Sequence, residues 1–294
     1  MKVIANDFVP VKPYDTKVVT LGIGQRTDVL VTANVGTSKS AFWMRSNISE
    51  ICSGTKQPSA LAAIYYDKAD TKKAPTSKAW NVPDPGTCRN DDLSLSVPYY
   101  ALKPQAPTTV KNLDVSFVVN GSNIFLWELD KQSFRANYNN PVLLLANQGN
   151  LSYPAAWNVK NFGSNSSIRV VVNNPTPAAH PMHLHGHNMF ILHEGPGNWD
   201  GTSVTNPNNP LRRDVQMLPA NGHIVWQINA DNPGVWPFHC HIAWHVSGGL
   251  YANILERPVD IKKDVPIPLI MAQTCRDWAA YTNTDVVEQI DSGL

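Results

Sequence analysis

The sequence predicts an all-β protein, and three observations support this fold class. Short runs of β-branched and aromatic residues are separated by clusters of Asn, Gly and Asp, which is typical of strands joined by turns. The chain contains 23 prolines, a high share for a globular protein, and charged residues make up only 16% of it. A length of 294 residues suits two domains. We therefore expect short strands packed as sandwiches or barrels, with a few short helices.

The first third of the chain is predicted to form one β-rich unit followed by a linker. Residues 18–32 have the pattern of two strands around a glycine turn, and residues 41–45 and 60–66 continue the β pattern. Residues 68–107 are rich in Pro, Lys, Thr, Asp and Asn, which is typical of a segment that wraps between domains. The predicted domains are therefore residues 1–95, with the linker, and residues 96–294.

The rest of the chain has a second β pattern. Strands are expected at residues 115–121, 141–146, 167–172, 223–229 and 249–257, with a strong turn at 231–234. Short helices are expected only at residues 214–218, 242–246 and 274–280.

Composition excludes several classes of protein and suggests a compartment. A net charge of +1 argues against a nucleic-acid binder and against a polybasic membrane surface. The chain lacks a run of 18 apolar residues, so we expect no membrane partner. Residues 1–5 do not form a signal peptide. Asn-X-Ser sequons and four cysteines nevertheless favour a secreted glycoprotein, so we expect the chain to begin inside a longer extracellular parent. The sequons are at Asn47, Asn120, Asn150 and Asn165.

All nine histidines lie between positions 180 and 245, and the first 179 residues contain none. Most of them fall in two clusters, residues 180–187 with the sequence HPMHLHGH and residues 239–245 with the sequence HCHIAWH. Imidazole and thiolate groups are the main ligands of transition metals in proteins. The two clusters therefore predict a metal centre, whereas the isolated His193 and His223, together with His187, are interpreted as core or surface residues.

Alternation along a strand gives the segment 239–241 two faces. Successive side chains of a strand point to opposite sides, so His239 and His241 face one way and Cys240 the other. One short strand can therefore contact two metal sites. His183 and His185 also share a face and can reach the side of the 239/241 pair.

The chemistry of the ligands indicates copper. His180, Cys240 and His245 supply two imidazoles and one thiolate, the set of a trigonal blue-copper site. A group made only of imidazoles suits copper that binds and reduces oxygen. A closed zinc site would need four ligands at one centre, which the alternation makes harder without excluding it. A buried structural role for the Cys240 thiol also remains open.

These residues resemble a known family. The two histidine clusters are similar to the two C-terminal copper signatures of multicopper oxidases, most closely those of fungal laccases. The segment 24–29, GQRTDV, looks like part of their middle cupredoxin domain, and residues 291–294, DSGL, resemble the C-terminal plug of ascomycete laccases. The resemblance covers nearly the whole chain and implies two cupredoxin-like Greek-key β-sandwich domains, the first of them incomplete.

The resemblance also implies roles for individual residues. His180, Cys240 and His245 match the blue-copper ligands, and Leu250 matches an axial position that cannot coordinate. His183 matches the ligand of the single normal copper of a three-copper cluster. The ligands of its paired coppers match His185, His239 and His241.

The activity implied is one-electron oxidation of a phenolic substrate coupled to reduction of O₂ to water. Electrons would enter at His245, the ligand nearest the substrate, and pass through Cys240 to His239 and His241. These four residues are the candidate catalytic residues.

The chain departs from the family pattern in its number of histidines. The three-copper cluster of the family takes eight histidines, and only four counterparts are present here. The remaining His-X-His motifs belong to an N-terminal cupredoxin domain, which is expected to be missing and needed to complete the cluster. The chain alone is therefore expected to hold a blue copper at best and to reduce oxygen poorly.

The remaining cysteines fit the same resemblance. Cys52 and Cys88 resemble a disulfide of ascomycete laccases, although two free thiols are the alternative. Cys275 matches a cysteine that bonds to the first domain in the family, so it is expected to be unpaired here.

The same residues also fit other functions. A ferroxidase of the same family would need carboxylates near the blue-copper histidine, whereas Leu250 speaks against an ascorbate oxidase. A blue-copper electron-transfer or copper-binding module needs only His180, Cys240 and His245. A cupin-like metal protein is a more distant alternative.

Overall fold

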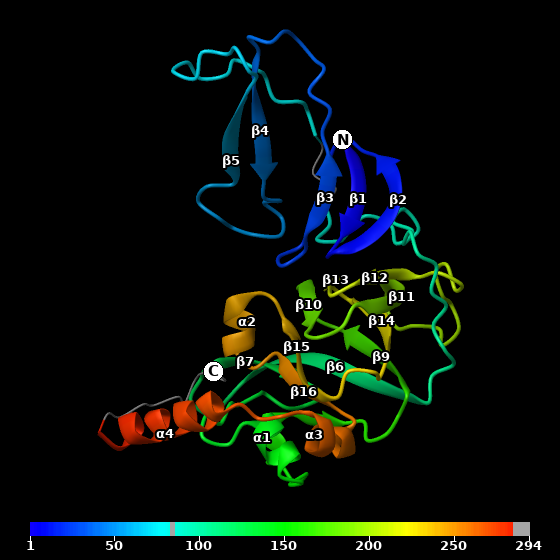
Figure 1. Cartoon of the computed structure of the whole chain (residues 1–294), viewed down its shortest axis with the longest axis vertical. Coiled ribbons are helices and arrows are strands. Elements are labelled where there is room, and N and C mark those ends of the chain that lie inside the picture. The colour runs from blue at the N-terminus through cyan, green and yellow to red at the C-terminus, as the bar shows by residue number, and fades with distance from the viewer. Residues whose placement is uncertain (83–85, 285–294) are drawn as a thin grey trace.

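The computed structural model describes residues 1–82 and 86–284, and its strands fall into two groups along the long axis (Figure 1). The N-terminal group contains a three-stranded sheet of order β2-β1-β3 and a two-stranded sheet, β4-β5. Its strands are β1 (Lys2–Asn6), β2 (Val9–Asp15), β3 (Thr27–Leu30), β4 (Ala41–Asn47) and β5 (Ser59–Tyr65).

The C-terminal group is a sandwich of two larger sheets. One sheet has the order β12-β11-β14-β9-β6-β7 and the other β13-β10-β15-β16-β8. Strand pairs are antiparallel except β6–β9 and β16–β8. The strands are β6 (Thr109–Val119), β7 (Phe125–Leu129), β8 (Val159–Asn161), β9 (Ser167–Asn174), β10 (His180–Leu184), β11 (Met189–Pro196), β12 (Leu211–Arg213), β13 (Val215–Leu218), β14 (Gly222–Asn229), β15 (Gly234–Cys240) and β16 (Tyr251–Glu256).

Helices complete this group: α1, α3 and α4 lie at the end farther from β1–β5, and α2 lies nearer to those strands (Figure 1). They are α1 (Val142–Asn147), the 3₁₀ helix Ala155–Trp157, α2 (Ala243–Ser247), α3 (Pro258–Asp264) and α4 (Leu269–Thr284). None of the helices in the described part of the chain has the length and hydropathy of a membrane-spanning helix.

The main core lies between the two large sheets and includes one candidate metal ligand. Phe238 and Cys240, two residues apart on β15, are fully buried beside Trp226 of β14 and Met182 of β10. Because side chains alternate along a strand, His239 points away from this core. Strand β10 pairs with β15 with Met182 opposite Cys240 and His183 opposite His239. The two histidine clusters are thus brought side by side by strand pairing.

Two predicted elements have the wrong secondary structure. Residues 142–147 form helix α1 and not the strand predicted over 141–146, because the run after Pro141 buries Val142 and Ala146 on one helical face. A short apolar run fits either structure by itself. Residues 214–218 form strand β13 and not a helix, because Val215 to Leu218 are all buried and pair with β10.

The prediction of two strands within residues 18–32 is also wrong, because only β3 forms there. Residues 22–26 form a turn instead, in which Gly22 N donates to Gln25 Oε1 at 2.7 Å. The predicted strands near 41–45, 60–66, 115–121, 167–172, 223–229 and 249–257 and the helices near 242–246 and 274–280 are confirmed.

The segment between β5 and β6 has little regular secondary structure. The described residues between 66 and 108 contain no helix or strand. They contact both groups: Ser96 accepts from Asn6 Nδ2, Lys12 N donates to the carbonyl of residue 97, and Tyr100 O accepts from Arg212 at 2.7 Å. A domain boundary between residues 95 and 96 stays a prediction.

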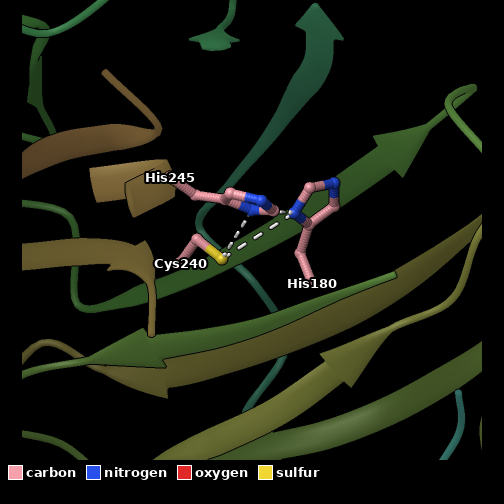
Figure 2. A group of neighbouring side chains, drawn as sticks. All are labelled: His180, Cys240 and His245. Carbon is pink, nitrogen blue, oxygen red and sulfur yellow. Dashed lines mark hydrogen bonds between the residues drawn. The ribbon is translucent and has the colours of Figure 1, made fainter. Parts of the chain in front are cut away.

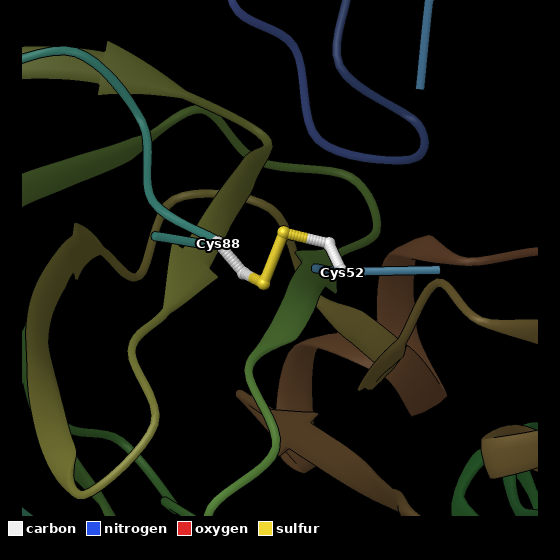
Figure 3. The surroundings of a disulfide bond; sticks show 2 residues. All are labelled: Cys52 and Cys88. Carbon is white, nitrogen blue, oxygen red and sulfur yellow. A yellow bond between two sulfur atoms is a disulfide. The ribbon is translucent and has the colours of Figure 1, made fainter. Parts of the chain in front are cut away.

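A disulfide joins Cys52 to Cys88, as the resemblance implied (Figure 3). Its Cα atoms lie 5.6 Å apart, and it connects the turn after β4 to the linker. Cys275, on α4, is free and half-buried. The predicted plug at residues 291–294 lies outside the described residues.

Candidate metal centre

The side chains of His180, Cys240 and His245 point toward one another (Figure 2). The Sγ atom of Cys240 lies 3.7 Å from Nδ1 of His180 and 3.5 Å from Nδ1 of His245, and the two nitrogens lie 3.1 Å apart. His180 opens β10 and Cys240 ends β15, while His245 sits on α2, which begins after residue 242 and turns the chain back. These are the three residues whose convergence the sequence predicted.

The spacing of these three atoms fits one small metal ion. Ligands about 2.0–2.3 Å from an ion in a trigonal plane lie roughly 3.5–4.0 Å from one another. The two distances to sulfur are close to this range, and the nitrogen pair is slightly shorter. Without a cation between them, the facing Nδ1 atoms of His180 and His245 can share only one proton in a hydrogen bond. The donor set of two imidazoles and a thiol therefore fits copper.

Burial keeps all three ligand groups uncharged in the metal-free protein. Desolvation, with a smaller effect of His245, lowers the pKa of His180 to about 3, and it lowers the pKa of His245 as well. Desolvation raises the pKa of the Cys240 thiol to about 12. The imidazole lone pairs are thus free at neutral pH, whereas the thiol must lose its proton to a metal ion before it becomes a ligand.

Trp127 of β7 packs against both histidines of this group. Its ring centroid lies 4.5 Å from that of His180 and 4.7 Å from that of His245. Such contacts fix ring orientation, which is the usual task of residues around a metal centre. No sequence signal near the histidine clusters indicated Trp127, because it comes from a strand more than fifty positions upstream.

A second group forms on the opposite face of β15. Ligand atoms of His183, His185 and His239 all lie within 4.8 Å of one another. His239 donates its Nδ1–H to Cys240 O at 2.8 Å, and His183 donates its Nδ1–H to Asp214 O at 2.8 Å. The Nε2 atom of each of these two rings therefore keeps its lone pair free. Nε2 of His239 lies 3.0 Å from Nε2 of His185. Desolvation lowers the pKa of His239 to about 4.

His241 lies beside this group without converging on it. Its ring centroid is 5.7 Å from that of His183 and 5.9 Å from that of His239. The 239–241 triplet therefore has the predicted two-faced arrangement, with the thiol in the core and both imidazoles behind it.

The three remaining histidines make other contacts. His187 donates from Nδ1 to His185 O and has its Nε2 3.0 Å from the buried carboxylate of Glu256. His193 and His223 stack on each other with 2.9 Å between Nδ1 and Nε2. These contacts agree with their interpretation as residues outside the two groups.

The match to family models identifies the chain. Residues 1–69 and residues 123–260 each match a model described as multicopper oxidase. The chain belongs to the multicopper oxidase family. Membership confirms the predicted family and copper as its cofactor, and the two ligand groups described above lie within the second matched region.

Several multicopper oxidases are similar to the whole chain. Laccase-2 of Botryotinia fuckeliana is 34% identical and Laccase-2 of Podospora anserina 33% identical, each over 100% of this chain and 51% of its own length. The chain thus spans about half the length of the curated relatives it matches.

Solved structures of multicopper oxidases confirm the cupredoxin-like all-β fold. The laccase from Botrytis aclada matches with a TM-score of 0.87 at 32% identity, over 100% of this chain and 54% of that one. Fet3p, a multicopper oxidase that functions in iron import, matches with a TM-score of 0.84 over 100% of this chain and 57% of that one. At 21% identity, the second match concerns the fold alone.

Proposed function

We propose that this chain is the blue-copper half of a laccase-like oxidase, which couples one-electron oxidation of phenolic compounds to reduction of O₂ to water. One observation carries the proposal: Cys240 and His239 are adjacent on β15 and belong to two different ligand groups on its two faces. A strand that serves two groups at once provides a short covalent path between them. A structural zinc site has no need of such a path.

The proposed ligands are divided between the groups. Copper, when bound, would accept one electron at a time from a reductant at the thiolate group and supply electrons to O₂ at the imidazole group. His180, Cys240 and His245 are the proposed ligands of the first. His183, His185, His239 and His241 are the proposed ligands of the second. Leu250, fully buried in the same core cluster as Cys240, has no side-chain donor atom and is proposed to line this copper site without coordinating.

The reducing substrate is proposed to approach at His245. This histidine is only partly buried, and its neighbour Trp244 is 84% exposed. An aromatic surface beside the exposed edge of a ligand suits a phenolic compound, which stacks on aromatic rings. Electrons would then pass from His245 through Cys240 to His239 and His241.

The imidazole group is proposed to need further ligands from polypeptide outside these 294 residues. Its four histidines are half of the number that a three-copper cluster of this family takes, and the matched relatives are about twice as long as the chain. We also propose an extracellular location for the full protein. The exposed side chains of Asn47 and Asn150 are the most accessible of the four sequons.

Copper loading of the purified chain tests the proposal. Wild type should develop the intense visible absorption of a thiolate-bound Cu(II) at one equivalent, and Cys240→Ser should lose it while still binding copper at imidazoles. His185→Ala is the matched variant: it should keep the absorption and lose part of the imidazole-bound copper. Stoichiometric copper without any thiolate absorption would refute the assignment.

A blue-copper electron-transfer module is the second candidate function. It is favoured by the completeness of the His180, Cys240 and His245 group within the chain. Oxygen uptake with a phenol, measured after the chain is combined with the segment that completes the cluster, separates the two functions.

A further inference from the structure

The turn of residues 22–26 reaches from the N-terminal group to the imidazole group. Gln25 Nε2 donates to Val215 O at 2.9 Å and to Asn90 Oδ1 at 2.9 Å. Val215 opens β13 and pairs with His183 of β10. The turn therefore sits on the strand that adjoins a proposed copper ligand.

Arg26 approaches His183 through Asp214. Its guanidinium binds the Asp214 carboxylate with both ends, NH1 to Oδ1 at 2.6 Å and NH2 to Oδ2 at 2.7 Å. The backbone carbonyl of the same Asp214 accepts the Nδ1–H of His183 at 2.8 Å. A bidentate pair restrains both the position and the plane of the carboxylate. The carbonyl that selects the tautomer of His183 thus belongs to a residue fixed by Arg26.

The buried carboxylate of Asp7 restrains the backbone on both sides of the Arg26–Asp214 ion pair. Asp7 has a fully buried side chain, and it accepts from Arg213 Nε at 2.8 Å and from the backbone N–H of Arg26 at 2.8 Å. Arg213 precedes Asp214 in the chain. Asp7 therefore restrains Arg26 through its backbone N–H and Asp214 through the preceding residue, Arg213.

Gly24 of the same turn lies against His241. Its φ is +84°, and an added Cβ would lie 2.5 Å from Cδ2 and 2.8 Å from Nε2 of the His241 ring. A side chain at this position would both strain the backbone and displace the ring. One turn thus contacts one histidine of the imidazole group directly and reaches another through Asp214.

We infer that Arg26 and Gly24 are positioning residues for the imidazole copper group, holding His183 and His241 respectively. The inference rests on the proposed function of this group. Residues that orient a ligand typically alter metal affinity by about 10–100-fold when removed. The N-terminal group contains no histidine, yet through this turn it sets the orientation of two proposed ligands.

The alternative is that Arg26 only joins the two groups of strands. The test therefore compares Arg26→Met with Lys2→Met, which removes the exposed Lys2–Asp15 pair from the same group of strands. Cu(II) affinity is measured at both ligand groups of the full chain, by the thiolate absorption and by the paramagnetic resonance of imidazole-bound copper. The tautomer of His183 is measured in the metal-free chain by ¹⁵N NMR of its ring.

Arg26→Met should weaken the imidazole group about 10–100-fold and leave the thiolate group unchanged. It should also reduce the population of the Nδ1–H tautomer of His183. Arg26→Lys keeps the charge without the bidentate guanidinium, so it should recover part of the copper affinity and part of the Nδ1–H tautomer population. Lys2→Met should change neither quantity. Gly24→Ala should weaken the imidazole group through His241 alone, with the His183 tautomer intact.

Equal weakening of both ligand groups by Arg26→Met, or no change in either, would overturn the inference. If this variant fails to fold, Arg26→Lys and Gly24→Ala decide the question by the same two measurements. If the wild-type chain binds stoichiometric copper without any thiolate absorption, the proposed function fails. In that case an unchanged His183 tautomer in Arg26→Met would overturn the positioning role separately.

Discussion

His239 donates its Nδ1–H to the backbone carbonyl of Cys240, the next residue in the chain, at 2.8 Å. This bond turns the Nε2 atom of His239 towards His185 while the Cys240 thiol points into the core. The backbone carbonyl of Cys240 therefore selects the tautomer that His239 presents to its ligand group. Local backbone geometry thus helps one strand present donor atoms to two candidate metal sites.

Copper binding at Cys240 should release one proton. Burial raises the thiol pKa to about 12, so the thiol is protonated across the usual pH range and copper must displace its proton. Affinity should accordingly rise about tenfold for each pH unit between pH 6 and 8. Calorimetry in two buffers of different ionisation enthalpy measures the proton count. Cys240→Ser is the control and should release none at this group, whereas proton-free binding by wild type would contradict the prediction.

Removing the Trp127 ring should weaken the thiolate absorption more than a comparable substitution elsewhere in the core does. Trp127→Ala is expected to cost about 3–5 kcal/mol of unfolding free energy and to weaken the thiolate absorption, because His180 and His245 lose a packed neighbour. Trp127→Phe should retain most of the absorption. Trp226→Phe is the matched control, since Trp226 is fully buried in the same core cluster. Similar spectral changes in Trp226→Phe would count against a specific role for Trp127.

Glu194 should make the fold less stable as the pH rises. Burial raises the pKa of this carboxyl from 4.5 to about 7, despite the hydrogen bond from Gln216. The folded chain therefore binds the proton more tightly than the unfolded chain. The contribution to stability is fully present below pH 4.5 and is lost as the pH rises to about 7. The loss is on the order of 3 kcal/mol.

Glu194→Gln removes this titration. The free energy of unfolding of the variant, relative to that of wild type, should therefore rise by about 2–3 kcal/mol from pH 5 to pH 8. Urea unfolding at the two pH values measures the change. The exposed Glu50→Gln substitution controls for the loss of one carboxylate. A difference between Glu194→Gln and wild type that is identical at both pH values would refute the prediction.

Loss of the Cys52–Cys88 disulfide should destabilise the N-terminal group of strands. The bond closes a loop with a sequence separation of 36 residues, for which the chain-entropy model gives roughly 4 kcal/mol. The double variant Cys52→Ala/Cys88→Ala should therefore unfold at lower denaturant concentration. Cys275→Ala, which removes a free thiol, should not. The thiolate absorption should survive in both variants, because neither change touches the sandwich core.

The two candidate ligand groups could be predicted from the sequence because the information is local. Alternation along a strand fixes the two faces of residues 239–241, and a turn after residue 242 is enough to return His245 to the thiol. The chemistry of two imidazoles and one thiolate then indicates copper without any knowledge of distant contacts. The disulfide and the two-domain cupredoxin plan came from the resemblance and not from any physical rule about spacing.

Only the tertiary structure decided the surroundings of those ligands. Residues 141–146 and 214–218 were assigned to the wrong secondary structure because short apolar segments take the form that their burial and pairing partners favour. Trp127 and Asp214 contact the candidate ligands, and Arg26 contacts Asp214, each from a separate segment of the chain. No local pattern assigns them to the site. The sequence by itself determined which side chains are the candidate metal ligands, because donor chemistry and strand period are local properties. The orientation of those side chains depends on packing between remote strands, which only the folded chain brings together.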